Sequence, residues 1–375
     1  MNKFRPPMLP SFLVHNPKTL WGMGNFGDIP NPARDALLPG PPSPTTCLVS
    51  ALVILTFLLA ACGSSTGMTN SSNTTTSIAG TKKISIGLGY IPDVQFAPFY
   101  VAKSKGYYSA VGLDVTFNHG IAPDLIGAMV AGKSDFVFAS GDETLVARDK
   151  HVPVIDVATI FQKYPVSLIV PADSPIKTLD ELKGHTIGVP GPFGATYTGL
   201  LALLYKAHLS LSDVQVQSIG FTQVAALLAH RVDAIMGYTN NEPLQLKQHG
   251  AAVRTFAVAD YQPLVSNGIV TTEDTYQHQP QVVRNFVQAT LKGLKDVIAD
   301  PQGAVETSKR YIPGLTDSSQ ALVVLKATIP LWQGSGQLGY NDNATWQSMA
   351  QFLVAQKIVS PVKDLHQAYT NQAVV

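Results

Sequence analysis

Aromatic, amide and carboxylate side chains follow several short apolar runs of this sequence. One cluster, residues 238–243, reads Tyr-Thr-Asn-Asn-Glu-Pro and comes directly after the run 234–237. Tyr238 could stack on a planar ring, Asn240 could present a donor and an acceptor, and Glu242 could accept hydrogen bonds from an amino group or a ring N–H. The alternative is a capped turn with Pro243 in the first helical turn. The residue types suit a flat heterocycle with a polar edge.

Two further clusters follow the runs 84–88 and 136–139. The first holds Tyr90, Asp93 and Gln95 beside Phe96 and Phe99, which could instead pack in a core. The second is Ser140-Gly141-Asp142, where Gly141 permits close backbone approach and Ser140 or Asp142 could either contact a ligand or cap the next helix.

Residues 161–164 and 191–197 give two more candidate positions. Gln162 carries both a donor and an acceptor, although a solvated loop would explain it equally well. Residues 191–197 lie between a strand and a long helix, where free backbone N–H groups can hold an anion or a carbonyl oxygen. Their spacing is neither that of a P-loop nor that of the dinucleotide fingerprint. The candidates in this stretch are Gly191, Phe193, Gly194 and Thr196.

Enzymatic chemistry finds little support in the sequence. The nine histidines are scattered, the chain has no HExxH motif, and its one Gly-x-Ser-x-Gly string, at 63–67, lies in a Ser/Thr-rich segment and not between a strand and a helix. We therefore expect no catalytic residues, no metal site and no cofactor.

Short β-rich runs alternate with helical runs, which indicates an α/β fold with parallel sheets. The alternation breaks near residue 175 and then restarts, and from Thr272 onward the pattern is mostly helical. Strands are expected at 84–88, 113–117, 136–139, 154–160, 166–170, 186–189, 214–219, 234–237 and 253–258. Helices are expected at 97–108, 125–131, 143–150, 195–209, 223–230, 242–249 and 282–299. Ligands bind beyond the carboxyl ends of strands in such sheets, which is where the clusters lie.

The first 83 residues differ in character from the rest. The apolar run 48–61 is too short to span a membrane and ends in Leu-Ala-Ala-Cys62, which resembles a bacterial lipoprotein signal. A buried core helix is the alternative, and the nearest basic residue, Arg34, is farther from the run than such signals usually place it. We expect a leader and signal at 1–61, lipidation of Cys62, and a flexible Ser/Thr/Asn-rich tether at 62–83.

Charge and cysteine content narrow the class of protein further. Removing the four basic and two acidic residues of 1–61 from the totals of 26 and 25 leaves 22 against 23, so no basic excess indicates nucleic-acid binding. The two cysteines are Cys47 and Cys62, and therefore residues 63–375 can form neither a disulfide nor a thiolate metal site.

Several motifs in order resemble the type II solute-binding proteins of ABC transporters, within the family that binds the aminopyrimidine precursor of thiamine, riboflavin, alkanesulfonates or nitrate. They span residues 84–315. They are Gly-Tyr-Ile-Pro at 89–92, Ala-Pro-Phe-Tyr-Val-Ala at 97–102, Lys-Gly-Tyr-Tyr at 105–108, Gly-Lys-Ser-Asp-Phe at 132–136, Leu-Asp-Glu-Leu-Lys-Gly at 179–184 and Arg-Val-Asp-Ala at 231–234.

This resemblance implies two lobes, one formed by 84–175 with 268–375 and the other by 176–267, with the ligand in the cleft between them. It also implies a monomer on the outer face of the membrane that delivers its ligand to an ABC permease and ATPase. The expected ligand is an aminopyrimidine, then riboflavin, then a sulfonate or another anion. Two alternatives are a pyrimidine-forming enzyme of the same fold, whose cysteine-rich iron motif this chain lacks, and a sensor domain.

Overall fold

The computed structural model describes residues 81–334 and 336–375, which belong to one compact unit, Thr75–Val375. The expected leader, Cys62 and nearly all of the expected tether lie outside the described residues. Lys82 and Lys83, which we expected in the tether, instead begin the first strand and pair with Leu113 and Asp114. The alkyl stems of lysine tolerate such half-exposed strand positions.

The first sheet has the strand order β2-β1-β3-β10-β4. Its strands are β1 (Lys82–Leu88), β2 (Leu113–His119), β3 (Phe136–Ser140), β4 (Val154–Thr159) and β10 (Asn267–Thr272). Four strands run in one direction, while β10 lies antiparallel between β3 and β4. The strand β10 was not predicted, because its short run Asn-Gly-Ile-Val-Thr-Thr resembles a loop followed by a helix start.

The second sheet has the order β7-β6-β8-β5-β9. Its strands are β5 (Val166–Pro171), β6 (Thr186–Val189), β7 (Gln215–Ser218), β8 (Ala234–Tyr238) and β9 (Val253–Ala257). Here β5 is the reversed strand, antiparallel to both β8 and β9. The division expected from the sequence placed β5 with the first lobe. Because β4 and β5 are equally apolar runs, their sequences do not reveal which sheet each one joins.

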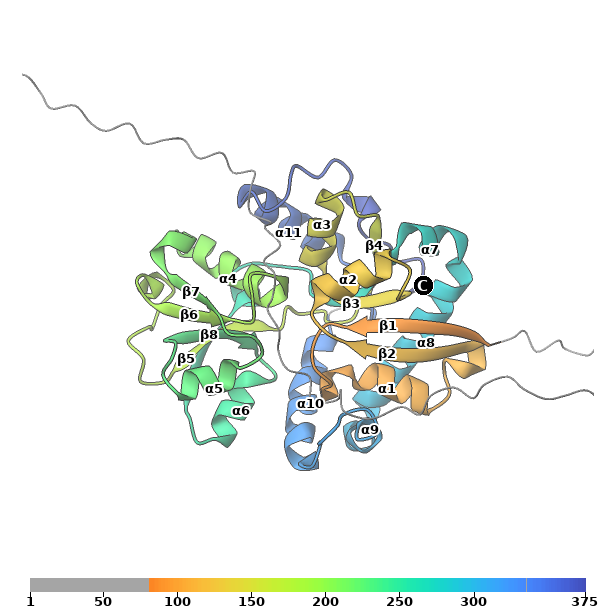
Figure 1. Cartoon of the computed structure of the whole chain (residues 1–375), viewed down its shortest axis with the longest axis horizontal. Helices are drawn as coiled ribbons and strands as arrows, with labels where there is room; N and C mark the ends of the chain where they lie inside the picture. The colour runs from red at the N-terminus through yellow and green to blue at the C-terminus, as the bar shows by residue number, and fades with distance from the viewer. Residues whose placement is uncertain (1–80, 335) are drawn as a thin grey trace, which may run out of the picture. The chain divides into compact units, whose positions relative to one another are not determined.

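Helices cover both faces of each sheet, which confirms the α/β fold class with two mainly parallel sheets and a helical C-terminal region (Figure 1). None of the described helices is long and apolar enough to cross a membrane. The helices are α1 (Ala97–Ser104), α2 (Ala122–Val130), α3 (Gly141–Asp149), α4 (Gly194–Lys206), α5 (Gln223–Leu228), α6 (Glu242–Gln248), α7 (Glu273–His278), α8 (Pro280–Ala299), α9 (Pro301–Ser308), α10 (Ser318–Trp332) and α11 (Asn343–Ala355).

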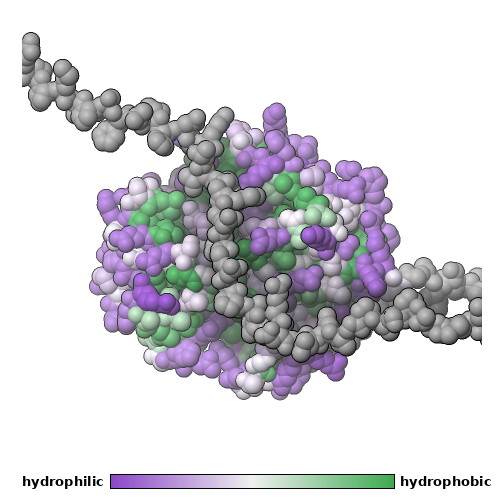
Figure 2. All heavy atoms as spheres, in the orientation of Figure 1, coloured by the Kyte–Doolittle hydropathy of each residue, from purple (hydrophilic) through white to green (hydrophobic). Residues whose placement is uncertain are grey.

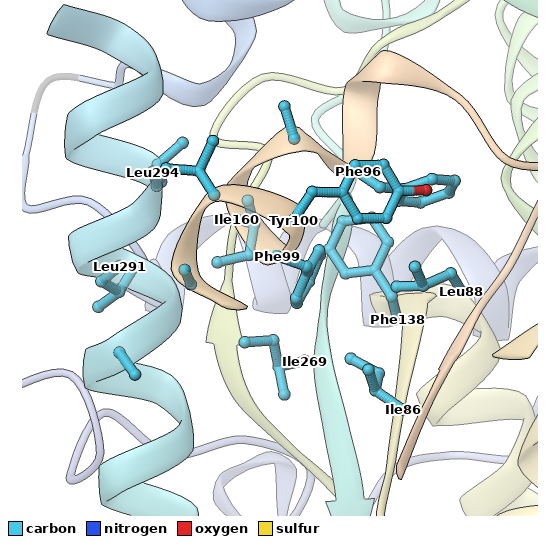
Figure 3. Close-up of a cluster of buried hydrophobic side chains, with 14 of the residues drawn as sticks. Ile86, Leu88, Phe96, Phe99, Tyr100, Phe138, Ile160, Ile269, Leu291 and Leu294 are labelled. Atoms are coloured by element: carbon cyan, nitrogen blue, oxygen red, sulfur yellow. The ribbon is translucent and has the colours of Figure 1, made fainter. Parts of the chain in front are cut away.

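Alternation along β3 shows how the first sheet is held between two apolar layers. Phe136 and Phe138 face the core formed with α1 and α8, whereas Val137 and Ala139 face the opposite layer with α2. Figure 3 shows Phe138 beside the aromatic side chains of the α1 region, with Leu291 and Leu294 approaching from α8. This packing fixes the wall from which the functional site is built.

One buried asparagine ties the C-terminal segment to the first sheet. The Asn341 Oδ1 accepts hydrogen bonds from Thr159 Oγ1 at 2.6 Å and from Trp346 Nε1 at 2.9 Å. Its Nδ2 donates to Asp156 Oδ1 at 3.2 Å and to the Thr370 carbonyl at 3.1 Å. Burial raises the pKa of Asp156 to about 7. A single amide side chain therefore satisfies polar groups from β4, α11 and the chain terminus.

Candidate functional site

A cavity of about 70 Å³ lies where the carboxyl ends of β1, β3, β6 and β8 meet. A volume of this size holds only a few water molecules. Its lining comes from both sheets and comprises Gly89, Tyr90, Gln95, Phe96, Ile121, Ala122, Phe138, Glu143, Pro190, Phe193, Gly194, Ala195, Thr196, Phe221, Gln223, Tyr238, Asn241, Glu242 and Asn267. We call this space the cleft cavity.

The cleft cavity brings together half of the residues that the sequence singled out. Those in the lining are Tyr90, Gln95, Phe193, Gly194, Thr196, Tyr238 and Glu242. Those outside it are Asp93, Ser140, Gly141, Asp142, Gln162, Gly191 and Asn240. The residues in the second group support the backbone near the cavity or make contacts elsewhere.

Three of these residues bond to neighbouring parts of the chain. The Asn240 Nδ2 donates to Thr328 Oγ1 on α10 at 2.7 Å, so this amide points away from the cavity. The Gln162 Nε2 donates to the carbonyls of Thr159 and Tyr340. The Asp93 Oδ1 accepts the Gln95 N–H at 3.0 Å and caps the short helix Val94–Phe96.

The two glycines outside the lining make close approaches within the protein. A β-carbon on Gly141 would lie 2.6 Å from the Val265 side chain, and one on Gly191 would overlap the ring of Phe193. Gly141 therefore lets α3 approach the chain that returns to the first sheet. Gly191 lets the Phe193 ring lie over the backbone beside the cavity.

Aromatic rings from both sheets line the cavity. The Tyr90 and Phe221 rings meet edge to face, with centroids 4.9 Å apart and planes at 81°. Phe96 and Phe138, whose centroids are 5.9 Å apart, form the wall on the side of the first sheet. Phe221 was not predicted, although its position just beyond the carboxyl end of β7 follows the same rule that selected the other clusters.

The turn after β8 is organised by Glu242. Its Oε2 accepts the Tyr238 N–H at 2.7 Å, and its carboxyl lies against Gly237, where a β-carbon would be 2.9 Å from the same oxygen. The Tyr238 hydroxyl donates to Asn267 Oδ1 at 2.9 Å, joining the turn to β10. Asn267 was missed because β10 was not predicted. The Asn241 Oδ1 accepts from Gln245 Nε2 at 2.7 Å.

Glu143 brings an unpaired carboxylate oxygen to the cavity. Its Oε2 accepts the backbone N–H and the hydroxyl of Ser140, both at 3.0 Å, in a capping box at the start of α3. Its Oε1 has no hydrogen-bond partner and faces Gly194, where a β-carbon would lie 3.3 Å away. The φ of Gly194 is 71°, so this first residue of α4 favours glycine. Neighbouring Asp142 accepts from Thr198 Oγ1 at 2.5 Å, which links α3 to α4.

The carboxyl groups around the cavity hold protons more tightly than exposed ones. Burial raises the pKa of Glu242 to about 7. Burial, followed by the charge of Asp142, raises the pKa of Glu143 to about 7, and burial also raises the pKa of Asp142. At neutral pH, Glu143 and Glu242 can therefore serve as either hydrogen-bond acceptors or donors.

These shifts predict that stability falls as pH rises. Glu143 and Glu242 bind protons more tightly in the folded chain than at the ordinary carboxyl pKa of 4.5. Their contribution is complete below that value and is lost as pH rises through about 7. Each can contribute at most about 3 kcal/mol, at about 1.4 kcal/mol per pKa unit. The free energy of unfolding is measured with urea at several pH values between about 5 and 8. We expect it to change less steeply with pH in Glu143→Gln than in the parent, whereas the exposed control Glu306→Gln keeps the parent's pH dependence. Equal slopes in all three proteins would contradict this assignment.

No metal site is found among the described residues, and the cleft cavity has no basic side chain in its lining. No group of three or more His, Cys, Asp or Glu side chains in the described ranges is arranged to hold a metal ion. The lining of the cleft cavity contains no lysine, arginine or histidine. The site therefore offers aromatic faces, amides and carboxyls to a bound molecule.

Comparison with known proteins identifies the family. Residues 93–304 match the family described as NMT1/THI5 like. The chain belongs to this family. The riboflavin-binding protein RibY of Chloroflexus aurantiacus is 36% identical over 336 residues, covering 86% of this chain and 96% of RibY. The formylaminopyrimidine-binding protein of Halalkalibacterium halodurans is 24% identical over 320 residues, covering 82% and 93% of the two chains.

Another group of relatives is named for a different activity. A 4-amino-5-hydroxymethyl-2-methylpyrimidine phosphate synthase of Legionella pneumophila is 23% identical over 297 residues, covering 77% of this chain and 92% of that one. Among solved structures, the alkanesulfonate-binding protein SsuA of Xanthomonas axonopodis pv. citri, bound to MOPS, aligns with a TM-score of 0.63 at 18% identity. That alignment covers 78% of this chain and 99% of SsuA, and it supports the two-sheet fold.

Proposed function

We propose that this protein is the extracytoplasmic solute-binding component of an ABC importer and that it captures a vitamin-related heterocycle between the two sheets, at the cleft cavity. The observation that carries the proposal is the cavity lining, which combines aromatic rings with amides and carboxyls from the ends of both sheets. Aromatic faces suit planar rings, while amides and carboxyls suit ring N–H, amino and carbonyl groups. Because the lining has no cationic side chain, a sulfonate or nitrate would find no charge partner there.

Riboflavin and a thiamine-precursor aminopyrimidine are the two ligands to test first. The family resemblance seen in the sequence placed the aminopyrimidine ahead of riboflavin, although the cluster residues suit both ligands. The 36% identity to RibY over nearly its whole length, against 24% to the formylaminopyrimidine-binding protein, favours the reverse order. Both molecules present a flat ring with donors and acceptors along one edge, as the lining requires.

Ligand capture would involve movement of the two sheets about the segments that join them. The chain crosses between β4 and β5 at 160–165 and returns between β9 and β10 at 258–266. We propose that these segments form the hinge and divide the lobes, in place of the boundaries near 175 and 267 expected from the sequence. Two short connections permit hinge closure, which excludes water and strengthens polar contacts to a ligand.

Titration of the purified full-length protein tests the proposal. Riboflavin binding is followed by quenching of flavin fluorescence, and binding of formylaminopyrimidine and hydroxymethylpyrimidine by calorimetry. Taurine and nitrate serve as anionic comparison ligands. Saturable binding of riboflavin or of either pyrimidine is expected, and binding only of the anions would refute the vitamin assignment.

We further propose that the protein is exported and anchored through a lipid on Cys62, as the motif Leu-Ala-Ala-Cys suggests. A lipid anchor and the Ser/Thr/Asn-rich segment that follows would keep a receptor near its permease. In cells of the source, Cys62→Ser is expected to abolish incorporation of a labelled fatty acid. Equal labelling of the parent and variant proteins would rule out Cys62 as the attachment point.

The synthase names among the relatives favour a pyrimidine-forming enzyme as the second candidate. We favour a binding protein without catalytic activity, because the cleft cavity lacks lysine, histidine and cysteine side chains that could act as a nucleophile or base. Incubation with pyridoxal phosphate and ferrous iron distinguishes the two. Formation of a pyrimidine product would establish the enzyme.

A further inference from the structure

A second, larger space adjoins the cleft cavity. It is a groove of about 720 Å³ between α2, α3 and α4, which we call the α2–α4 groove. On the face shown in Figure 2, green apolar residues occur around α4 and also towards α2 and α3. The apolar side chains that matter here are Ile126, Val130, Val146, Tyr197, Leu201 and Leu204.

The two spaces share part of their lining. Glu143, Phe193 and Gly194 contribute to both the cleft cavity and the α2–α4 groove. The Phe193 ring lies over Gly191, at the boundary between the two spaces. The groove therefore continues the cleft and is not a remote surface depression.

Buried polar groups line the cleft side of this combined space and its junction with the groove. The unpaired Glu143 Oε1 lies at the junction, and the side chain is only 9% exposed. Gln95 and Gln223 line the cleft side, at 7% and 4% exposure. The groove side is mostly apolar, with side chains from α2, α3 and α4, although Asp142, Lys150, Ser210 and Gln356 also line it. A ligand that fills both parts must have a hydrogen-bonding edge and a bulky apolar end.

The volumes of the two spaces limit the size of a ligand that could fill them. Sites for small molecules usually enclose roughly 300–1,000 Å³, a range that contains the groove but not the cleft cavity. A single pyrimidine ring would leave the groove empty and its apolar walls in water. A flavin has a pyrimidine-like edge with N–H and carbonyl groups at one end of its fused rings and a dimethylated benzene ring at the other.

We propose that the α2–α4 groove holds the apolar end of a fused-ring ligand of the flavin class, whose N–H edge donates to Glu143 Oε1 at the junction. This inference rests on the function proposed above and narrows its ligand. It makes α2 and α4, as well as the strand ends, determinants of specificity.

Filling the groove tests the proposal. Val130→Trp and Leu201→Trp each place a large ring in the α2–α4 groove from opposite walls. Val323→Trp on α10 is the matched control, because Val323 is 48% exposed and Val130 is 45% exposed, and Val323 lines neither space. Thermal unfolding of each full-length variant verifies that it folds. Riboflavin affinity is measured by fluorescence quenching, and affinity for hydroxymethylpyrimidine by calorimetry.

Both groove variants are expected to weaken riboflavin binding about tenfold or more, whereas Val323→Trp retains the parent affinity. Unchanged riboflavin affinity in both folded groove variants overturns the inference. Parent protein that binds the pyrimidine but not riboflavin also overturns it, while leaving the importer function intact. If the parent protein binds neither riboflavin nor hydroxymethylpyrimidine, both the groove proposal and the proposed vitamin-binding function are refuted. Sedimentation tests one further outcome. If the parent forms a dimer that Val130→Trp does not form, and both bind riboflavin equally well, the groove binds a second copy of the chain and not the flavin.

Discussion

Replacing Asn341 with leucine is expected to lower the free energy of unfolding by about 3–5 kcal/mol. The change removes the acceptor used by Thr159 and Trp346 and the donor used by Asp156 and the Thr370 carbonyl. A buried polar group that loses its partner costs about 1–3 kcal/mol, and several groups lose theirs together. Leucine has the same branched shape and the same number of side-chain heavy atoms, so the loss arises mainly from hydrogen bonding and not from a cavity.

Urea denaturation followed by tryptophan fluorescence measures this effect, since Trp346 lies within the network. Asn118→Leu is the matched control, because Asn118 is an exposed residue of β2. Its free energy of unfolding is expected to stay within about 0.5 kcal/mol of the parent value. A similar small change for Asn341→Leu would mean that solvent replaces the lost bonds and that the C-terminal segment is only loosely attached.

Replacing Glu242 with alanine is expected to weaken heterocycle binding about 100-fold. The carboxyl group is buried at 3% exposure and accepts the Tyr238 N–H, so its removal both frees the turn and deletes a polar group of the cavity lining. Truncation of a central, buried polar group in a binding site commonly costs 2 kcal/mol or more, and about 2.8 kcal/mol corresponds to this loss.

Glu242→Gln separates the two roles of this side chain. Glutamine retains one oxygen that can accept the Tyr238 N–H, and it resembles the protonated carboxyl that a pKa of about 7 makes accessible. If Glu242 mainly holds the turn, the glutamine variant should bind nearly as well as the parent. If the negatively charged carboxylate binds the ligand directly, the glutamine and alanine variants should lose similar affinity. Parent-like titration curves for Glu242→Ala would remove this residue from the site.

Much of the architecture could be predicted because nine of the ten described strands and most of the described helices have strong local patterns. The sequence placed the strand 186–189 at its observed bounds and the α8 helix within two residues of its start. The pattern could not reveal that β5 and β10 are reversed strands inserted between others. Pairing partners depend on contacts between distant segments, and β10 meets β3 through residues more than a hundred positions away.

The candidate site was predictable as a set of loops but less so as a set of side chains. Strand ends identified Tyr90, Phe193 and Tyr238, which all reach the cavity. Asn240 and Asn241 are chemically identical neighbours, yet Asn240 bonds to α10 while Asn241 lines the cavity. That choice depends on the backbone of the turn and on the position of α10, neither of which the local sequence encodes.

The two carboxylate oxygens of Glu143, in the capping box of α3, also show how far local sequence can predict the position of a side chain. Spacing alone suggests that Glu143 satisfies the backbone N–H of Ser140, and its Oε2 does so. Its other oxygen reaches the cavity only because Gly194 brings α4 close to it. The local capping motif thus accounts for the position of one oxygen, and packing between helices determines the position of the other.

The position of β10 also has a consequence for the order in which the chain is completed on the ribosome. The strands β3 and β4 both pair with β10 and not with each other, so they cannot be joined until residues 267–272 have been synthesised. All strands of the second sheet, 166–257, emerge before that point as one uninterrupted stretch. The second sheet can therefore assemble first, while the apolar edges of β3 and β4 stay unpaired and exposed to premature association.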